Sequence, residues 1–266
     1  MAIYDCFQYF DEDHMVDLRL NILNQYVDFF VISESTKTHQ GKDKKINFDI
    51  KKFSKFKNKI KFIIADYKEE VNFEKHTGGE SPIEQHQRNA LIEGIRDASP
   101  EDLIILSDSD EIPDLEKLRD IDKNKQFIAF SQKMFMYKLN LQNLNESNWI
   151  GSKITKKKNI TSMQDLRNLK FKKYPFWRLD KNNLQTIKGG WHFSFMQTPE
   201  HILNKIESFS HGEFNTNDIN EQNIEEKILK NEDIFGRGIT LKKIKIDSSY
   251  PAYILNNKGN FLKWII

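Results

Sequence analysis

The first half of the chain alternates short apolar runs with segments whose apolar residues recur at helical spacing. Four runs have the length of buried strands, at residues 3–7, 29–32, 60–64 and 103–106. Helical spacing lies between them, at residues 15–26, 48–56 and about 83–97. Such βαβα alternation predicts an α/β fold with a doubly wound, mainly parallel sheet and flanking helices.

The pattern changes after Pro113. Residues 127–139 alternate polar and apolar positions, which predicts half-exposed antiparallel strands. The sequence also predicts a hairpin at 177–187 and helices near 202–209 and 224–229. Residues 261–266 are expected to form an edge strand or a helix packed on the core. The polar stretch 143–173, with three consecutive lysines at 156–158, is expected to be an acceptor-side loop or simply a solvated surface. Without repeats or linkers, residues 1–266 are predicted to form one domain.

The most informative motif follows the fourth apolar run. Asp108, Asp110 and Glu111 come directly after this expected strand and precede Pro113, a residue suited to the first turn of a helix. Open α/β sheets bind ligands at the carboxyl ends of their strands. Two carboxylates at i and i+2 can share one hard divalent cation and leave positions open for phosphate oxygens. The alternative is a helix N-terminus whose acids cap free amides.

Composition narrows the classes of function. The chain has 266 residues, 38% of them hydrophobic, and a net charge of +2, so no overall field favours nucleic acid. Cys6 is the single cysteine, which excludes an internal disulfide and a cysteine-based zinc site. No apolar run reaches transmembrane length, and the start lacks a signal-peptide pattern. A cytoplasmic protein without a transmembrane segment is therefore expected.

Several other residues are candidates for ligand contacts. Gly190 and His192 belong to a Gly-Gly-Trp-His segment that could approach a ligand closely, or form a glycine turn before an aromatic core strand. Arg88, on the helix before the acidic strand, could bind a diphosphate, or simply lie on a helix surface. Glu34 follows the second strand and could accept a hydrogen bond from a ribose or base.

Two carboxylates near helix ends, Glu213 and Asp233, could each serve as the base that deprotonates an acceptor hydroxyl. Ordinary helix C-termini would show the same residues.

Seven motifs taken together resemble glycosyltransferase family 17, which includes the β-1,4-mannosyl-glycoprotein 4-β-N-acetylglucosaminyltransferases. They agree with the family in order and in approximate spacing over residues 4–240. The motifs are Tyr4-Asp5-Cys6-Phe7, Arg19-Leu20-Asn21, residues 27–34, Gln87-Arg88-Asn89, residues 107–113, residues 190–194 and residues 205–213.

This resemblance implies a GT-A type fold, with a donor-binding half at about 1–113 and an acceptor half at about 114–266. It also implies a UDP-sugar donor, which is UDP-N-acetylglucosamine in the characterised members, a glycan or glycolipid acceptor, Mn²⁺ or Mg²⁺, and inversion to a β-linkage. By position, Asp108 and Asp110 match the metal-binding pair. Donor-binding roles fall to Glu34, Arg88, Asp108, Gly190, His192 and His211, and catalysis to Asp233 or its rival Glu213.

Two other classes of function stay open from the residues alone. A nucleotidyltransferase or metal-dependent phosphohydrolase could use the same acidic strand end, given further carboxylates for a second cation. An inactive glycosyltransferase-like domain that binds a glycan or a partner is the other.

Overall fold

A computed structural model describes residues 1–69, 81–172, 174–175, 177–181, 183–208 and 219–266. Its strands are β1 (Ile3–Gln8), β2 (Phe29–Ser35), β3 (Ile60–Ala65), β4 (Leu103–Ser107), β5 (Glu111–Ile112), β6 (Phe127–Met136), β7 (Leu141–Asn143), β8 (Trp149–Lys156), β9 (Leu184–Ser194) and β10 (Leu241–Lys243). Its α-helices are α1 (Asp13–Leu23), α2 (Pro82–Ala90), α3 (Met163–Asn168), α4 (Pro199–Ser208), α5 (Glu221–Leu229) and α6 (Ala252–Asn256).

The described strands join into one sheet with two regions of different character. In the first region, β3, β2, β1 and β4 are parallel neighbours, as the apolar runs predicted. In the second, β8 runs antiparallel to both β4 and β6, and β9 lies parallel to β6. The predicted α/β class is therefore confirmed, with the antiparallel pairs gathered after β4.

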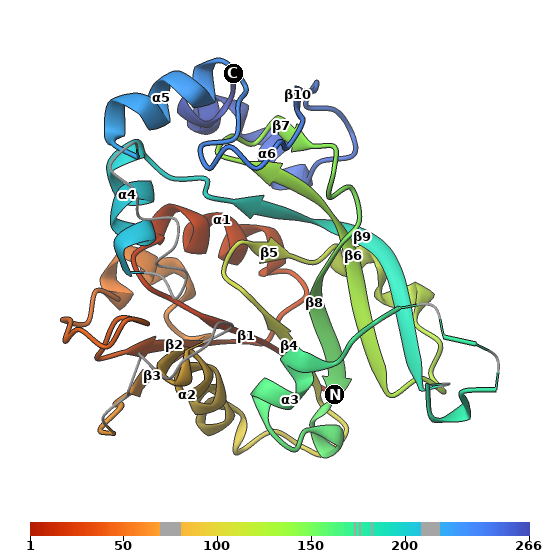
Figure 1. Ribbon diagram of the computed structural model, residues 1–266. Coiled ribbons are helices and arrows are strands. Elements are labelled where there is room, and N and C mark those ends of the chain that lie inside the picture. Colours follow the sequence, from red (N-terminus) through yellow and green to blue (C-terminus); the bar gives the residue numbers. More distant parts are fainter. Residues whose placement is uncertain (70–80, 173, 176, 182, 209–218) are drawn as a thin grey trace.

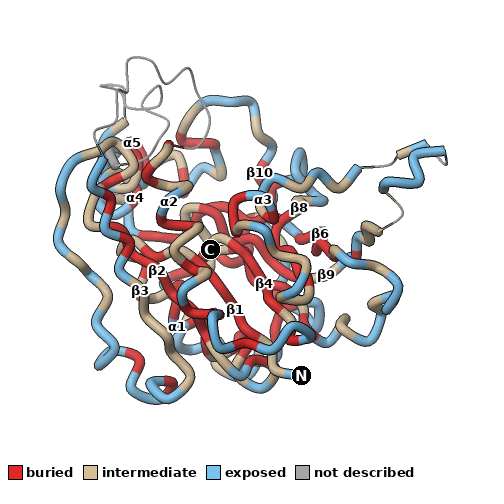
Figure 2. Tube along the Cα trace, turned by 90° about the horizontal axis from the view of Figure 1, so that it is seen from below, coloured by how far each residue is buried: buried red, intermediate tan, exposed pale blue. Residues whose placement is uncertain are grey.

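Helices cover both faces of the parallel region because its strands carry apolar side chains on both sides. Tyr4 and Cys6 of β1 pack in one cluster with Leu91 and Ile95, which follow α2. Phe7 faces the opposite cluster, to which α1 contributes its buried face. Figure 1 shows α1 and α6 on one side of the sheet, and α2 and α3 on the other. In Figure 2 the buried residues follow these central strands.

The structure corrects three expectations about local elements. Residues 177–187 do not form a hairpin, because β9 begins at Leu184 and pairs in parallel with β6. The polar stretch 143–173 is not a loop, since it contains β8 and α3. The helix expected at 83–97 consists of α2 followed by a 3₁₀ helix, Leu91–Ile95.

The end of the chain packs on the body as the helical alternative predicted. A 3₁₀ helix spans Lys258–Trp264, and the Trp264 ring stacks on His14 of α1 at a centroid separation of 4.6 Å. Among the described residues, no helix has both the length and the apolar character needed to cross a bilayer.

A glycine lets the 3₁₀ helix after α2 lie close against β2. A β-carbon at Gly94 would lie 2.3 Å from Cγ1 of the buried Val31. We therefore expect Gly94→Ala to lower the free energy of unfolding by about 1–3 kcal/mol through overpacking. Urea unfolding is the measurement. Gly259→Ala, in another 3₁₀ helix with open space around it, is the matched control. Equal stability of the two variants would contradict this packing.

Candidate active site

A cleft of about 630 Å³ opens at the carboxyl ends of β1, β4, β6 and β9. Both halves of the chain contribute to its lining. The lining residues with polar or charged side chains include Gln8, Glu12, His39, Glu84, Gln87, Asp108, Ser109, Asp110, Asn143, Glu146, Arg167, His192, Ser194, Lys205 and Arg237. This is the edge of the sheet at which the acidic motif was expected.

Asp108 follows β4 directly and is held by two arginines. Its Oδ2 accepts a hydrogen bond from Arg167 Nη2 at 2.6 Å, and its Oδ1 lies 3.8 Å from Arg88 Nη2. The Asp108 side chain is 37% exposed; partial desolvation alone would raise its pKa, but the guanidinium groups of Arg167 and Arg88 outweigh that effect and lower it. Asp108 is therefore an ionised carboxylate whose charge is already compensated by the protein.

Asp110 lies beside His192, which comes from β9. Asp110 Oδ1 and His192 Nε2 are 3.5 Å apart. Burial alone would raise the pKa of Asp110, yet the His192 imidazolium lowers it to about 2. The reciprocal effect of Asp110 outweighs burial and raises the pKa of His192. His192 Nδ1 is buried and has no hydrogen-bond partner among the described residues.

Strand pairing brings this histidine to the acidic turn. Glu111 in β5 pairs with His192 in β9, and the Phe193 amide donates to the Asp110 carbonyl at 2.9 Å. Gly190 makes the close approach possible. Its φ is +105°, and a β-carbon there would lie 2.6 Å from the Ile112 carbonyl oxygen. Gly190 therefore has a packing role in the structure and is not among the residues that line the cleft.

Glu111 serves the turn and does not face the cleft. Its buried carboxylate accepts from Trp149 Nε1 at 2.7 Å, from Arg167 Nη1 at 3.2 Å and from the Asp108 amide at 3.2 Å. The alternative of a helix N-terminus at residues 108–111 is thereby excluded, because these residues form a turn that leads into β5.

Arg19 fixes the backbone of the same turn from below. This fully buried residue of α1 pairs with Asp5 of β1 through Nε at 2.7 Å and Nη2 at 2.5 Å. Its Nη1 donates to the carbonyls of Glu111 at 2.6 Å and Asp108 at 3.2 Å. The acidic turn is thus built on a buried ion pair.

Two predicted donor ligands have other partners within the protein. The Glu34 carboxylate is fully buried and accepts from Lys44 Nζ and from the amides of Asn47 and Phe48, so it organises residues 44–48. The buried Arg88 bonds Gln164 at 2.6 Å and Glu84 at 2.9 Å. Neither lines the cleft, and their roles in donor binding stay predictions.

Asp233 also has its oxygens occupied. It accepts from Tyr137 OH at 2.9 Å, and from Arg237 through Nη2 at 2.8 Å and Nε at 2.9 Å. Burial alone would raise its pKa, but the hydrogen bonds from Arg237 outweigh burial and lower it. A carboxylate with a lowered pKa is a weak base. Glu213 and His211 lie outside the described residues.

Sequence reasoning missed the importance of Arg167. The residue lies on α3, whose N-cap Ser162 accepts a hydrogen bond from the Asp165 amide at 2.9 Å. The spacing of Ser162 and Asp165 was a detectable helix-start signal within a stretch interpreted as a loop. Lys153 Nζ donates to the Arg167 carbonyl and so supports the same helix. The sequence carried no signal that Arg167 would reach Asp108.

The donors present fit part of a cation site. Two ligand atoms that each lie about 2.1 Å from a metal are roughly 3.0–3.5 Å apart. The separation of Asp110 Oδ1 and His192 Nε2 falls at the upper end of that range. Within the described part of the chain, no group of three or more His, Cys, Asp or Glu side chains is gathered to hold a metal ion. Asp110 and His192 are the better placed donors, because Asp108 is bound by Arg167.

Comparison with known proteins supports the motif resemblance. The sequence model of glycosyltransferase family 17 matches residues 1–238. This match confirms the resemblance to the family, and the structure itself shows the α/β fold with a mostly parallel region. A search of curated proteins finds no match.

Solved structures show only distant likeness. One is a Bacillus anthracis protein described as a glucose-1-phosphate thymidylyltransferase, with 11% identity, a TM-score of 0.39, and coverage of 71% of this chain and 88% of that one. An active-site mutant of LgtC has 11% identity, a TM-score of 0.33, and coverage of 69% and 72%. A glycosyltransferase involved in glycosylation of the PBCV-1 major capsid has 12% identity, a TM-score of 0.30, and coverage of 71% and 81%. Likeness at this level adds nothing to the family match.

The dependence of the acidic turn on Arg19 can be tested by unfolding. Arg19→Met leaves Asp5 as a buried, uncompensated charge, so we expect a loss of about 3–5 kcal/mol in the free energy of unfolding. The double variant Asp5→Leu/Arg19→Met should regain part of this loss, because no lone charge remains buried. Urea denaturation is the measurement, with the exposed Arg119→Met as control. A loss below about 1 kcal/mol for Arg19→Met would contradict the assignment.

Proposed function

Because the chain belongs to glycosyltransferase family 17, we propose that it transfers a sugar from a UDP-sugar donor to a hydroxyl of a glycan or glycolipid. Family membership establishes a glycosyltransferase with a sugar donor and an acceptor. The UDP group, an N-acetylglucosamine residue, inversion to a β-linkage and dependence on Mn²⁺ or Mg²⁺ are parts of the proposal. The family match favours this activity over a nucleotidyltransferase or a phosphohydrolase.

The observation that carries the proposal is the grouping of Asp108, Asp110 and His192 in one cleft at the carboxyl end of β4. Asp110 and His192 would hold the divalent cation, with Asp108 close by. When bound, such a cation neutralises the negative charge that develops on the departing nucleoside diphosphate. Carboxylates suit Mn²⁺ and Mg²⁺, and a single imidazole is compatible with Mn²⁺.

The protein's own cations would share that task. Arg167, Lys205 and Arg237 all line the cleft. Lys205 Nζ lies 3.4 Å from Glu12, whose other carboxylate oxygen accepts from the Phe10 amide at 3.0 Å. These fixed positive groups would attract and orient a diphosphate before the reaction. Side chains of Trp149, Phe195 and Phe235 line the same cleft and could pack against sugar faces.

A transfer that inverts the anomeric carbon needs one base, which takes the proton from the acceptor hydroxyl. As the bond from the acceptor oxygen to the anomeric carbon forms, the bond to the diphosphate breaks, and the hydroxyl proton passes to a carboxylate. Asp233 and Glu213 are the two candidates. The ion pair between Asp233 and Arg237 favours Glu213.

The activity is tested by measuring free UDP released from a panel of UDP-sugars with and without Mn²⁺. We expect release from UDP-N-acetylglucosamine that depends on the cation. Nucleotide binding without turnover toward any acceptor in the panel would instead support an inactive binding domain. Stabilisation of the fold by CTP or phosphate esters, and not by UDP, would contradict the proposal.

Removal of the central carboxylate should be the most damaging single change. We expect Asp110→Ala to abolish transfer and to weaken Mn²⁺-dependent binding of UDP, because the cation loses its best placed ligand. Calorimetric titration of UDP and an assay of UDP release measure the two effects. The matched control is Asp120→Ala, which removes an exposed carboxylate from a second Asp-x-Asp triplet, Asp120-Ile121-Asp122. Near-normal turnover of Asp110→Ala would count decisively against this site.

The identity of the base can be decided by two neutral substitutions. We expect Glu213→Gln to lower kcat by about 10²- to 10⁴-fold while UDP binding is kept, because a positioned base contributes that much to the rate. Asp233→Asn should instead lower the melting temperature, since it weakens the contacts to Arg237 and Tyr137. If the Asp233→Asn variant is stable and binds UDP but has a strongly lowered kcat, Asp233 would be the catalytic base instead.

A further inference from the structure

A second surface lies between α3 and β9, outside the cleft. Its described residues run from 169 to 183 with gaps at 173, 176 and 182, and Figure 1 shows this segment extending beyond the edge of the sheet. Figure 2 shows the same projection from another direction. Two large apolar side chains are presented to solvent on it, with exposed fractions of 66% for Trp177 and 72% for Leu179. None of its described residues lines the cleft.

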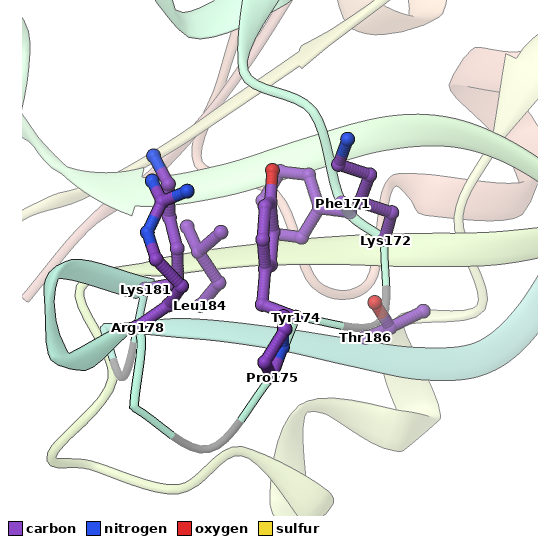
Figure 3. Close-up of a pocket in the computed structure, with 8 residues that line it drawn as sticks. All are labelled: Phe171, Lys172, Tyr174, Pro175, Arg178, Lys181, Leu184 and Thr186. Carbon is purple, nitrogen blue, oxygen red and sulfur yellow. The ribbon is translucent and has the colours of Figure 1, made fainter.

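Cations surround an aromatic ring on the same segment. A cavity of about 220 Å³ is lined in part by Lys172, Tyr174, Arg178 and Lys181. The ammonium nitrogens of Lys172 and Lys181 each lie 5.5 Å from the Tyr174 ring centroid, and the guanidinium carbon of Arg178 lies at 5.8 Å. Figure 3 shows Tyr174 between Lys172 on one side and Arg178 and Lys181 on the other.

The charge of this segment is strongly one-sided. Residues 170–181 contain five basic residues and one acid, Asp180. Asp180 accepts from Arg178 Nε at 2.8 Å and from its Nη2 at 2.9 Å, so it compensates only part of the positive charge. The chain as a whole has a net charge of only +2, so this is a local concentration and not a general property.

We propose that Lys172, Tyr174, Trp177, Arg178, Leu179 and Lys181 form a contact surface for an anionic lipid bilayer. Tryptophan and tyrosine favour the interface between water and lipid, where an apolar ring and a polar edge are both accommodated. Basic side chains are attracted to anionic headgroups, and their aliphatic stems pack along apolar surface. The strength of binding to a membrane surface grows with the apolar area buried in the interface and with the electrostatic attraction to anionic lipids, and this surface offers both.

This surface is independent of the proposed transfer reaction, because the two sites share no residue. If both proposals hold, attachment would keep the enzyme at the surface where glycolipid acceptors reside. Loss of membrane binding would then leave the release of UDP in solution unchanged.

Trp177 provides a direct spectroscopic probe. Of the four tryptophans, Trp191 and Trp264 are buried and Trp149 is partly buried in the cleft, so Trp177 is the most exposed. The purified full chain is mixed with phosphatidylcholine vesicles, with or without phosphatidylglycerol. We expect a blue shift of tryptophan emission and co-sedimentation with the anionic vesicles only, both reduced by added salt.

Two double variants separate the apolar contribution from the basic one, and a third variant is the control. Trp177→Ser/Leu179→Ser removes the apolar side chains, and Lys172→Gln/Lys181→Gln removes two charges. Each should lower the vesicle partition coefficient by roughly tenfold or more, because each basic or apolar group contributes several-fold. Leu229→Ser, at an equally exposed leucine on α5, is the matched control and should bind as the unmodified chain does. Melting temperatures check that all variants fold.

Several outcomes would overturn the proposal. Equal binding to neutral and anionic vesicles, or unchanged binding of both double variants, removes its physical basis. Stabilisation by inorganic phosphate without vesicle binding would assign the cavity to a small anion. A concentration-dependent dimer that Trp177→Ser/Leu179→Ser dissociates would make the surface a contact between two copies of the chain.

Discussion

The buried ion pair between Arg19 and Asp5 is the interaction on which the active site rests. Asp5 lies in the middle of β1, between β2 and β4, so its charge is tolerated only because Arg19 binds both carboxylate oxygens. The remaining guanidinium nitrogen then holds the carbonyls of the acidic turn. A side chain with five fixed donors can satisfy both partners at once, which a lysine cannot. The position of Asp108 and Asp110 therefore depends on a contact made beneath the sheet edge.

The acids above this ion pair are balanced by cations from several elements. Arg167 comes from α3, Arg88 from α2, and His192 from β9, and each lies next to one of the carboxylates. Both side chains are only partly exposed, and the compensating charges lower the pKa of Asp108 and of Asp110, which keeps the two carboxylates ionised. The compensation also reduces the repulsion that an uncompensated acidic cluster would exert on a diphosphate. Under the proposed function, this compensation would let the cleft hold carboxylates for a cation and still accept an anionic donor.

The later strands of the sheet bring His192 to the acidic turn, to which the parallel strands contribute only the acids. Because β9 runs parallel to β6 and also pairs with the short β5, it carries His192 to the acidic turn. Gly190 permits this crossing, since any side chain there would meet the backbone of residues 112–114. The helices α4 and α5 pack with β6 in a third apolar cluster. Residues from both halves of the chain therefore meet in one cleft.

The sequence alone determined the parallel strands, the position of Asp108 and Asp110 directly after β4, and the family. The strands and the acidic motif are local features, because an apolar run and the residues that follow it are adjacent in the chain. Arg167, the pairing of His192 with Asp110, and the Asp233–Arg237 ion pair beside Tyr137 were decided only by tertiary structure. The pairing of β9 with β6 placed His192, and α3 placed Arg167, across separations of 82 and 59 residues. Glu34 gives a second example. Its position at the end of β2 was predictable from the apolar run, but its hydrogen bonds with Lys44 and with the amides of residues 47 and 48 were not. Periodicity reports which face a side chain takes, whereas the partner it meets depends on how distant elements pack.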